Sequence, residues 1–181
     1  MPPELLTPRL KLWMPPPERA EEVVAYFERN RSHLEPWEPA RPSGFYSRRF
    51  WEARLAANIQ EQASSQSMRL FLELRGSGRL VGSCNFSNVM RGAFQACHLG
   101  YAIGAAEQGR GFMHEALSGA LPFAFEQLAL HRIMANYQPV NERSGRLLRR
   151  LGFVVEGYAR DYLYIDGAWR DHVLTSLTRP L

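Results

Sequence analysis

Cysteine is scarce in this sequence, which has only Cys84 and Cys97 among its 181 residues. Two cysteines cannot build a disulfide framework, and the five histidines show no metal-ligand spacing with either of them. The two cysteines lie at mirror positions about Met90-Arg91 in an expected hairpin, where directly opposed cysteines would form a strained disulfide. We therefore expect two buried free thiols, no metal site and no covalent cysteine nucleophile.

Long apolar runs are also missing, since none approaches the roughly 18 residues of a membrane-spanning helix. The first residues, Met1-Pro2-Pro3-Glu4, have neither the basic stretch nor the apolar core of a secretory signal. Hydrophobic residues still make up 45% of the chain, enough for a sizeable core. These features predict a single cytoplasmic domain over residues 1–181, with no membrane partner.

Charge of one sign is not concentrated, because the net charge is only +4 at pH 7. Such a charge is ordinary for a soluble domain and does not indicate specific DNA binding. Four arginines nevertheless lie close together in the sequence: Arg143, Arg146, Arg149 and Arg150. They either reach the phosphates of an anionic ligand or form a solvated helix face, and the sequence leaves both interpretations open.

Apolar spacing and turn residues predict a mixed, mainly antiparallel α/β chain. Strands are expected at 10–14, 68–75, 80–88, 94–103, 131–137, 154–158, 162–165 and 169–177. Helices are expected after Pro15-Pro16-Pro17 and at 47–62, 112–128 and 141–151. A loop rich in proline and aromatic residues, 34–39, is expected between the first two helices.

The most informative segment is Gln108-Gly109-Arg110-Gly111-Phe112-Met113, between an expected strand and the longest expected helix. A strand that turns through two glycines into a helix directs free backbone N–H groups and the positive end of the helix dipole at one point. The natural guest there is a phosphate or pyrophosphate. The spacing is neither the dinucleotide fingerprint nor a P-loop, so an ordinary strand-to-helix turn stays open at this point.

The order of these elements resembles a GNAT-type N-acetyltransferase, with Gln108-Gly109-Arg110-Gly111 after the fourth strand and Asn141-x-x-Ser144 at the next helix. In that family a Q/R-x-x-G-x-G/A motif holds the pyrophosphate of acetyl-CoA through backbone amides. Met113 replaces the final Gly or Ala, which predicts crowding at the closest amide. The resemblance implies an α/β (α+β) GNAT fold, a mixed, mostly antiparallel sheet with a splayed central strand pair, flanked by helices.

Further segments are similar to the RimJ-like subgroup, the ribosomal-protein-alanine N-acetyltransferases. These segments are 34–39, 85–89, 132–137 and 164–175. The resemblance implies acetyl transfer from acetyl-CoA to the N-terminal alanine of a ribosomal protein, by direct attack in a ternary complex, and association with the ribosome. Two alternatives stay open: transfer to a small-molecule or lysine amine, and a non-catalytic ribosome-associated binding protein.

The resemblance also implies an acetyl-CoA site, residue by residue. The pantetheine arm is expected along Leu99, Gly100, Tyr101, Ala102 and Ile103, and the pyrophosphate at Gln108, Gly109, Arg110, Gly111, Phe112 and Met113. Asn141 is expected to hydrogen-bond the arm. Ser144 is expected at the thioester sulfur, where it protonates the leaving thiolate or instead caps its own helix. Tyr158, with Tyr137 and Tyr162, is the second candidate proton donor.

The acceptor amine sets how strong a general base must be. An α-amino group has a pKa near 8, so about a tenth is neutral at pH 7, whereas a lysine amine is almost wholly charged. An N-terminal substrate therefore needs only a modest base. Candidate bases are Glu35, Glu38, Glu73 and Glu156, and Glu35, Trp37 and Glu38 are expected to flank the substrate. His114 and His172 are expected to be structural or surface histidines.

Overall fold

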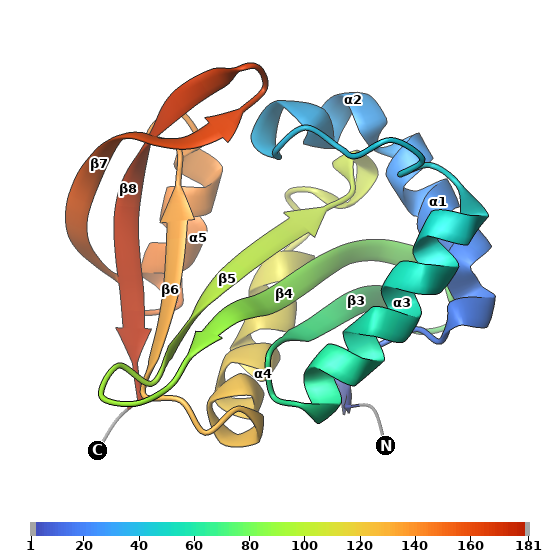
Figure 1. Cartoon of the computed structure of the whole chain (residues 1–181), viewed down its shortest axis with the longest axis horizontal. Coiled ribbons are helices and arrows are strands. Elements are labelled where there is room, and N and C mark those ends of the chain that lie inside the picture. The colour runs from blue at the N-terminus through green and yellow to red at the C-terminus, as the bar shows by residue number, and fades with distance from the viewer. Residues whose placement is uncertain (1–2, 180–181) are drawn as a thin grey trace.

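The computed structural model describes residues 3–179, which form one eight-stranded sheet in the order β1-β2-β3-β4-β5-β6-β8-β7 (Figure 1). The strands are β1 (Glu4–Leu6), β2 (Leu10–Trp13), β3 (Met68–Leu74), β4 (Leu80–Met90), β5 (Ala96–Ile103), β6 (Arg132–Tyr137), β7 (Val154–Ile165) and β8 (Ala168–Thr178). The α-helices are α1 (Ala20–Arg29), α2 (Arg31–Leu34), α3 (Arg48–Ala63), α4 (Phe112–Gln127) and α5 (Glu142–Arg150). Short 3₁₀ helices cover Pro17–Arg19, Glu35–Trp37 and Ala105–Glu107.

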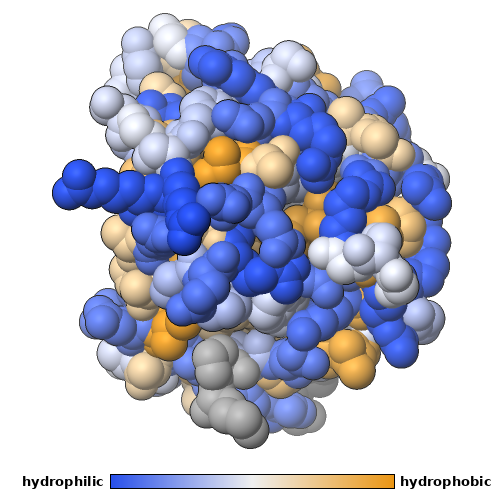
Figure 2. All heavy atoms as spheres, turned by 90° about the vertical axis from the view of Figure 1, so that its right-hand side faces the viewer, coloured by the Kyte–Doolittle hydropathy of each residue, from blue (hydrophilic) through white to orange (hydrophobic). Residues whose placement is uncertain are grey.

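Helices α1 and α3 cover one face of the sheet through an aromatic cluster. Ser47 caps α3 by accepting a hydrogen bond from the backbone N–H of Phe50 at 3.2 Å. Phe27 of α1 stacks on Trp51 of α3 at 4.9 Å between ring centroids, and both rings meet Phe71 of β3 edge to face. The outer surface over these helices is largely hydrophilic (Figure 2). Within residues 3–179, no helix is both long enough and apolar enough to span a membrane.

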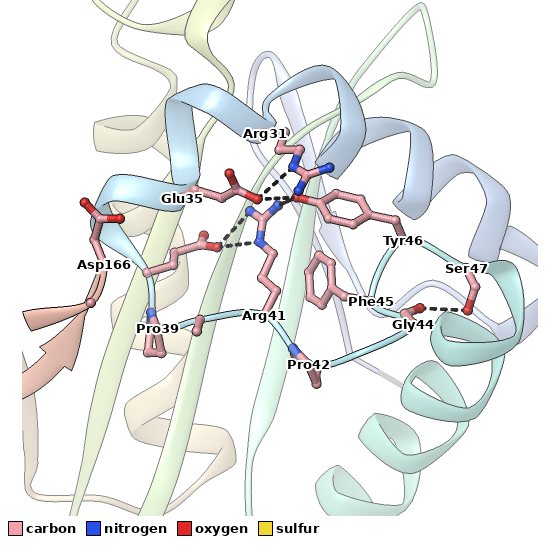
Figure 3. Close-up of a pocket in the computed structure, with 13 residues that line it drawn as sticks. Arg31, Glu35, Pro39, Arg41, Pro42, Gly44, Phe45, Tyr46, Ser47 and Asp166 are labelled. Carbon is pink, nitrogen blue, oxygen red and sulfur yellow. Dashed lines mark hydrogen bonds and ion pairs between the residues drawn. The ribbon is translucent and has the colours of Figure 1, made fainter.

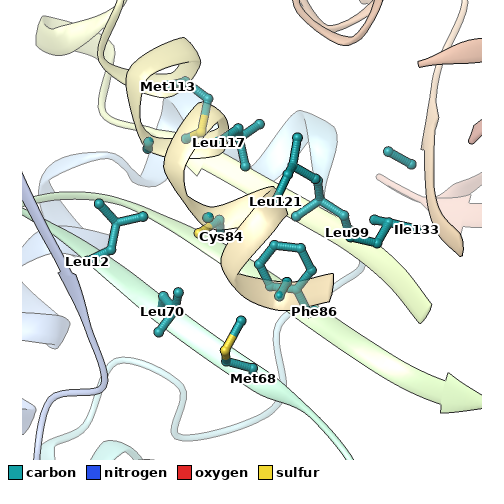
Figure 4. Close-up of a cluster of buried hydrophobic side chains, with 14 of the residues drawn as sticks. Leu12, Met68, Leu70, Cys84, Phe86, Leu99, Met113, Leu117, Leu121 and Ile133 are labelled. Carbon is teal, nitrogen blue, oxygen red and sulfur yellow. The ribbon is translucent and has the colours of Figure 1, made fainter. Parts of the chain in front are cut away.

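Helix α4 covers the opposite face and supplies the centre of the main core. Its Met113, Leu117 and Leu121 pack among buried side chains from five strands, including Leu12, Leu70, Phe86, Leu99 and Ile133 (Figure 4). Side chains alternate between the two faces along each strand, so the residues between these point toward α1 and α3. The two faces of the sheet therefore carry different sets of side chains.

The parallel pair β5 and β6 separates partway along its length. Only Ala96, Cys97 and His98 of β5 pair with β6, opposite Arg132, Ile133 and Met134. Beyond His98 the two strands diverge, and α2 lies over the wide end (Figure 1). The segment 99–103 stays paired with β4 on its other side, so the edge that faces the opening keeps unpaired backbone groups. The expected splayed central pair is confirmed.

The expected order of long elements is also confirmed, but short or irregular ones differ. β1 and α2 were not expected, since three or four residues carry too little periodicity to register. The expected strands 154–158 and 162–165 are one strand, β7, with a register irregularity between Ala159 and Leu163.

The two cysteines do not face each other. Cys84 lies opposite Tyr101, because the hairpin is centred about two residues later than the mirror argument assumes and contains an irregularity between Ser87 and Met90. Both thiols are free and buried, as expected, and burial raises the pKa of each to about 12. At neutral pH both are therefore protonated and unreactive.

Candidate functional site

A groove of about 1100 Å³ opens where β5 and β6 separate. One wall is formed by residues 99–103 of β5 and by the glycine loop with the start of α4. The facing wall is formed by the end of β6, residues 136–138, and by the first turns of α5. The segment 33–45, which begins in α2, lines the rest of the groove. This volume matches the larger ligand sites of proteins. The groove brings together segments that lie more than a hundred residues apart in the chain.

The glycine loop bends sharply into α4. Gly109 and Gly111 have φ of +72° and +78°, a conformation that strains any other residue. Gly111 is the N-cap of α4, and no side chain caps the helix. The N–H groups of Phe112, Met113 and His114 therefore start the helix without an intrahelical or side-chain partner, which favours an anion at this point.

Residues from the N-terminal end of the chain hold this loop. Arg9 donates from Nη1 to the carbonyl of Arg110 at 3.0 Å, and its guanidinium lies over the ring of Phe112. Its Nε pairs with Glu115 of α4 at 2.5 Å, and Thr7 donates to the same carboxylate at 2.6 Å. Burial raises the pKa of Glu115, but these hydrogen bonds outweigh it and leave the pKa below its ordinary value.

Met113, which replaces the final Gly or Ala of the motif, packs in the main core and also lines the groove. The side chain is 8% exposed and lies among the core residues that pack against α4 (Figure 4). Neighbouring side chains in the first turn of a helix point to different sides, so a large apolar side chain at position 113 can point into the core. The substitution therefore adds packing to the core, and crowding at the closest amide stays a prediction.

Helix α5 begins on the other side of the groove, and here a side chain does cap it. Asn141 Oδ1 accepts from the backbone N–H of Ser144 at 3.2 Å. Ser144 is thus not the cap, and its Oγ lies 2.6 Å from the hydroxyl of Tyr101 on β5. Burial raises the pKa of Tyr101 to about 12, so its phenol keeps the proton at neutral pH.

A chain of polar contacts closes the wide end of the groove. His33 Nε2 lies 3.2 Å from the carbonyl oxygen of Ile103 and 3.0 Å from Gln108 Nε2. Arg143 of α5 donates to Gln108 Oε1. Buried Glu107 pairs with Arg79 at 2.7 Å. Sequence reasoning does not identify His33, Arg79 or Glu107, because their partners lie on other elements and no local motif marks them.

The expected substrate residues divide between the groove and a second hollow beside it. Trp37, 40% exposed, and Glu38 line the groove. Glu38 also lines the second hollow, of about 660 Å³, with Glu35 and Asp166, and Arg41 holds the Glu38 carboxylate at 2.9 Å (Figure 3). Hydrogen bonds from Arg31 lower the pKa of exposed Glu35, helped by Tyr46.

Two expected catalytic side chains lie outside the groove. Glu73 of β3 is paired with Arg19 at 3.2 Å, and two strands separate it from the opening. Tyr158 of β7 is 57% exposed and donates to Asp171 at 2.6 Å. Neither residue lines the groove. Neither side chain is therefore placed to reach a reacting group in the groove. The sequence does not reveal this, because the position of a residue within a strand does not show which edge of the sheet that strand occupies.

The remaining candidates are placed as follows. Tyr137, His114 and His172 line the groove, as do Asn141, Ser144 and the arginines Arg143, Arg146 and Arg150. Glu156 pairs with Arg132 at 2.6 Å on an exposed edge, and Tyr162 accepts a hydrogen bond from Asn136 at 3.2 Å behind the groove wall. Among residues 3–179, no cluster of metal-ligating side chains occurs.

Comparisons with known proteins agree with this geometry. The sequence matches the acetyltransferase (GNAT) domain family over residues 8–154. It is 47% identical over 178 residues to ribosomal protein uS5-alanine N-acetyltransferase of Escherichia coli strain K12, covering 97% of this chain and 91% of that protein. The structure of ribosomal-protein-S5-alanine acetyltransferase from Vibrio fischeri superposes with a TM-score of 0.93 at 35% identity, covering 98% of this chain and 100% of that chain.

A second solved structure is that of Mycobacterium smegmatis RimJ in complex with CoA-disulfide. It has a TM-score of 0.87 at 30% identity and covers 98% of this chain and 86% of that chain. The match to the E. coli enzyme and both structural matches extend over nearly the whole chain, including the strands that form the groove. The chain therefore belongs to the GNAT family of acetyltransferases.

Proposed function

We propose that this protein transfers the acetyl group of acetyl-CoA to the N-terminal α-amino group of a ribosomal protein that begins with alanine. The observation that carries the proposal is the 47% identity with the E. coli uS5-alanine enzyme over almost the full length of both chains. A ribosomal substrate also implies a cytoplasmic enzyme that meets ribosomes or newly made ribosomal proteins.

The groove suits CoA at both of its ends. A Cβ added to Gly109 would meet nothing within 4 Å, so the loop faces open space, beside the free amides at the start of α4. Arg143, Arg146 and Arg150 line the same region and bring positive charge to the mouth. We assign the pyrophosphate to residues 108–113 and the pantetheine arm to the unpaired edge of residues 99–103, with Asn141 beside it.

Bound acetyl-CoA supplies an activated acetyl group as a thioester. Ser144 is then the proton donor to the departing sulfur, and Tyr101, hydrogen-bonded to it at 2.6 Å, restores the serine proton. The raised pKa of Tyr101 keeps a proton available for this step.

A peptide acceptor fits the site better than a small amine. The groove and the second hollow share a wall made by Glu38, Pro39, Ala40, Arg41, Pro42 and Phe45. The second hollow thus adjoins the groove, and we expect the residues that follow an N-terminal amine to extend over this segment toward it. Trp37, Glu38 and Glu35 would contact those residues, and a polyamine or a free amino acid would leave the second hollow unused.

The proposal is tested by mass spectrometry of acetyl transfer. The acceptors are a peptide that starts with alanine and contains an internal lysine, the same peptide with its N-terminus blocked, and a polyamine. We expect acetylation of the free N-terminus alone. Transfer to the lysine or the polyamine would reject the N-terminal substrate while keeping the enzyme class, and acetyl-CoA binding without any transfer would favour a binding protein.

The variant Ser144→Ala tests the proton donor. It keeps the α5 cap, because the cap uses the backbone N–H of Ser144 rather than its hydroxyl. We expect kcat to fall about 10²-fold with acetyl-CoA affinity within a few fold of wild type. Tyr101→Phe should give a smaller loss, since a water molecule can replace the more distant proton source.

A further inference from the structure

His172 differs from the other polar groups of the groove in how its ring is held. It lies on β8, is only 3% exposed and packs its ring against Tyr162 at 5.4 Å between centroids. Its Nδ1 lies 2.9 Å from the backbone carbonyl oxygen of Arg170. A carbonyl oxygen only accepts, so Nδ1 carries the hydrogen and, in the neutral ring, Nε2 has a free lone pair.

The free nitrogen is available to the groove. Within residues 3–179, Nε2 of His172 has no hydrogen-bond partner, and the atom is not sealed from solvent. His172 itself lines the groove wall. The ring is thus fixed in position by one nitrogen while the other can accept a proton.

Strand alternation places His172 on the opposite face of the sheet from Ser144 and Tyr101. Tyr101 pairs with Cys84, which lies in the core beneath α4, so Tyr101 points to the α4 face. Leu174 pairs with Asn136, whose neighbour Ala135 lies in the same core, so Asn136 and Leu174 point to the other face. His172, two residues from Leu174 along β8, shares that face.

The face that holds His172 is also the acceptor side. Ser83 and Asn85 flank Cys84 on β4, point away from α4 and line the groove, as do Trp37 and Glu38 of the segment between α1 and α3. The proton donor at Ser144 and the free nitrogen of His172 therefore approach the opening of the sheet from opposite sides. In this arrangement one group can take a proton from the incoming amine while a separate group gives one to the departing sulfur.

The other bases near the acceptor are already engaged. Glu38 Oε2 accepts from Arg41 at 2.9 and 3.3 Å. Glu35 accepts from Arg31 and Tyr46 in the second hollow. His33 Nε2 already lies between the carbonyl oxygen of Ile103 at 3.2 Å and Gln108 Nε2 at 3.0 Å.

We infer that His172 is the general base that takes the proton from the acceptor amine, through Nε2 directly or through one water. The inference rests on the proposed acetyl transfer. Overall, an ammonium group and a thioester become an amide, a thiol and one released proton. His172 carries that released proton from the amine nitrogen to solvent, while the second proton lost by nitrogen balances the one that Ser144 gives to sulfur.

The main test is His172→Asn, whose side-chain amide can keep the hydrogen bond to the Arg170 carbonyl but has no atom at the Nε2 position. We expect kcat for the alanine peptide to fall about 10²-fold, with CoA affinity within threefold of wild type. His131→Asn is the matched control, because His131 is exposed at the far end of β6. A loss below threefold in the first variant would overturn the inference, as would Glu38→Gln showing the large loss instead.

Two further measurements separate a base from a structural residue. An acceptor peptide with an aminooxy group, which is already neutral at pH 7, should lose less than tenfold with His172→Asn; equal losses on both acceptors would overturn the inference. His172→Gln provides a second variant if the first does not fold.

Nitrogen-15 shifts of the histidine ring in the CoA-bound protein report the tautomer without turnover. The Nδ1–H form supports the inference and the Nε2–H form overturns it. If the wild-type protein acetylates a lysine or a polyamine instead, the proposed N-terminal substrate is wrong. The effect of His172→Asn on acetylation of that amine then still tests whether His172 is the general base.

Discussion

Two helices begin at the same groove, and they begin differently. Helix α5 starts at Asn141, whose side chain accepts from the backbone N–H of Ser144. Helix α4 starts at Gly111, which has no side chain to offer and leaves the first N–H groups open. Both starts carry the positive end of a helix dipole toward the groove. The Asn141 side chain supplies an oxygen to the start of α5, whereas the start of α4 has no side-chain cap and can bind an anion.

The difference indicates which part of the groove is stable by itself and which is completed by the ligand. Asn141 makes α5 a fixed wall that positions Ser144 against Tyr101. The glycine loop instead depends on Arg9 and Glu115 from outside the groove and on its bound anion from inside.

The largest effect should come from CoA itself. At a concentration 100 times its Kd, CoA should add about 2.7 kcal/mol to the free energy of unfolding. For a domain of this size that corresponds to a rise in Tm of about 5–10 °C. Hydrogen exchange should show new protection at Phe112, Met113 and His114, and little change at the start of α5. Equal gains in protection at the starts of α4 and α5 would contradict the difference between the two helix starts.

Gly109→Ala should weaken CoA binding at least tenfold, about 1.4 kcal/mol, because the added methyl group enters the space before the free amides. The matched control is Gly92→Ala in the β4–β5 turn. Gly92 has a similar φ of +70° and equally open surroundings. Both variants should lose about 1 kcal/mol of stability from backbone strain, but only the first should lose affinity in titration calorimetry.

Asn141→Ala should lower the free energy of unfolding by about 1 kcal/mol, since it removes the α5 cap. Chemical denaturation measures this loss directly. Asn141→Asp keeps an oxygen for the cap and should restore the stability. If Asn141 also donates to the pantetheine arm, the aspartate variant will remain stable yet bind CoA more weakly, which separates the two roles of this side chain.

Glu115→Gln should have the smallest effect, below about 1 kcal/mol at pH 7. The pKa of Glu115 is lowered in the folded state, so its ionised form adds stability above the ordinary value of 4.5 and loses it as pH falls through the folded pKa. The difference between wild type and variant should therefore shrink below pH 4.5. A difference that stays constant with pH would argue against the carboxylate charge as its source.

The fold could be predicted largely because its signals are local. Ser47, Gly111 and Asn141 mark helix starts, and alternating apolar residues mark the strands. The order of these elements, together with the glycine loop and the Asn141-x-x-Ser144 turn, indicates the family.

Only those parts of the site that are formed by residues close together in the sequence could be predicted. The glycine loop and the Asn141-x-x-Ser144 turn are contiguous, and both line the groove. Glu73 and Tyr158 were misplaced because a strand sequence gives alternation but neither the strand order nor the distance to the splayed edge. The sequence predicts a structural or surface histidine at His172, because the basis of the proposed role is a backbone carbonyl two residues away and the face of the sheet that the ring occupies, neither of which a local motif marks.

The contact between Arg9 and the glycine loop joins residues about 100 positions apart in the chain. During synthesis the N-terminal strand therefore leaves the ribosome long before the helix that it must hold. The enzyme gains its complete cofactor loop only after residues beyond 115 have emerged, so a nascent copy is inactive until most of it has been made. For the same reason, a truncated form that begins after Arg9 would contain every groove residue and still lack the part that holds its anion site in place.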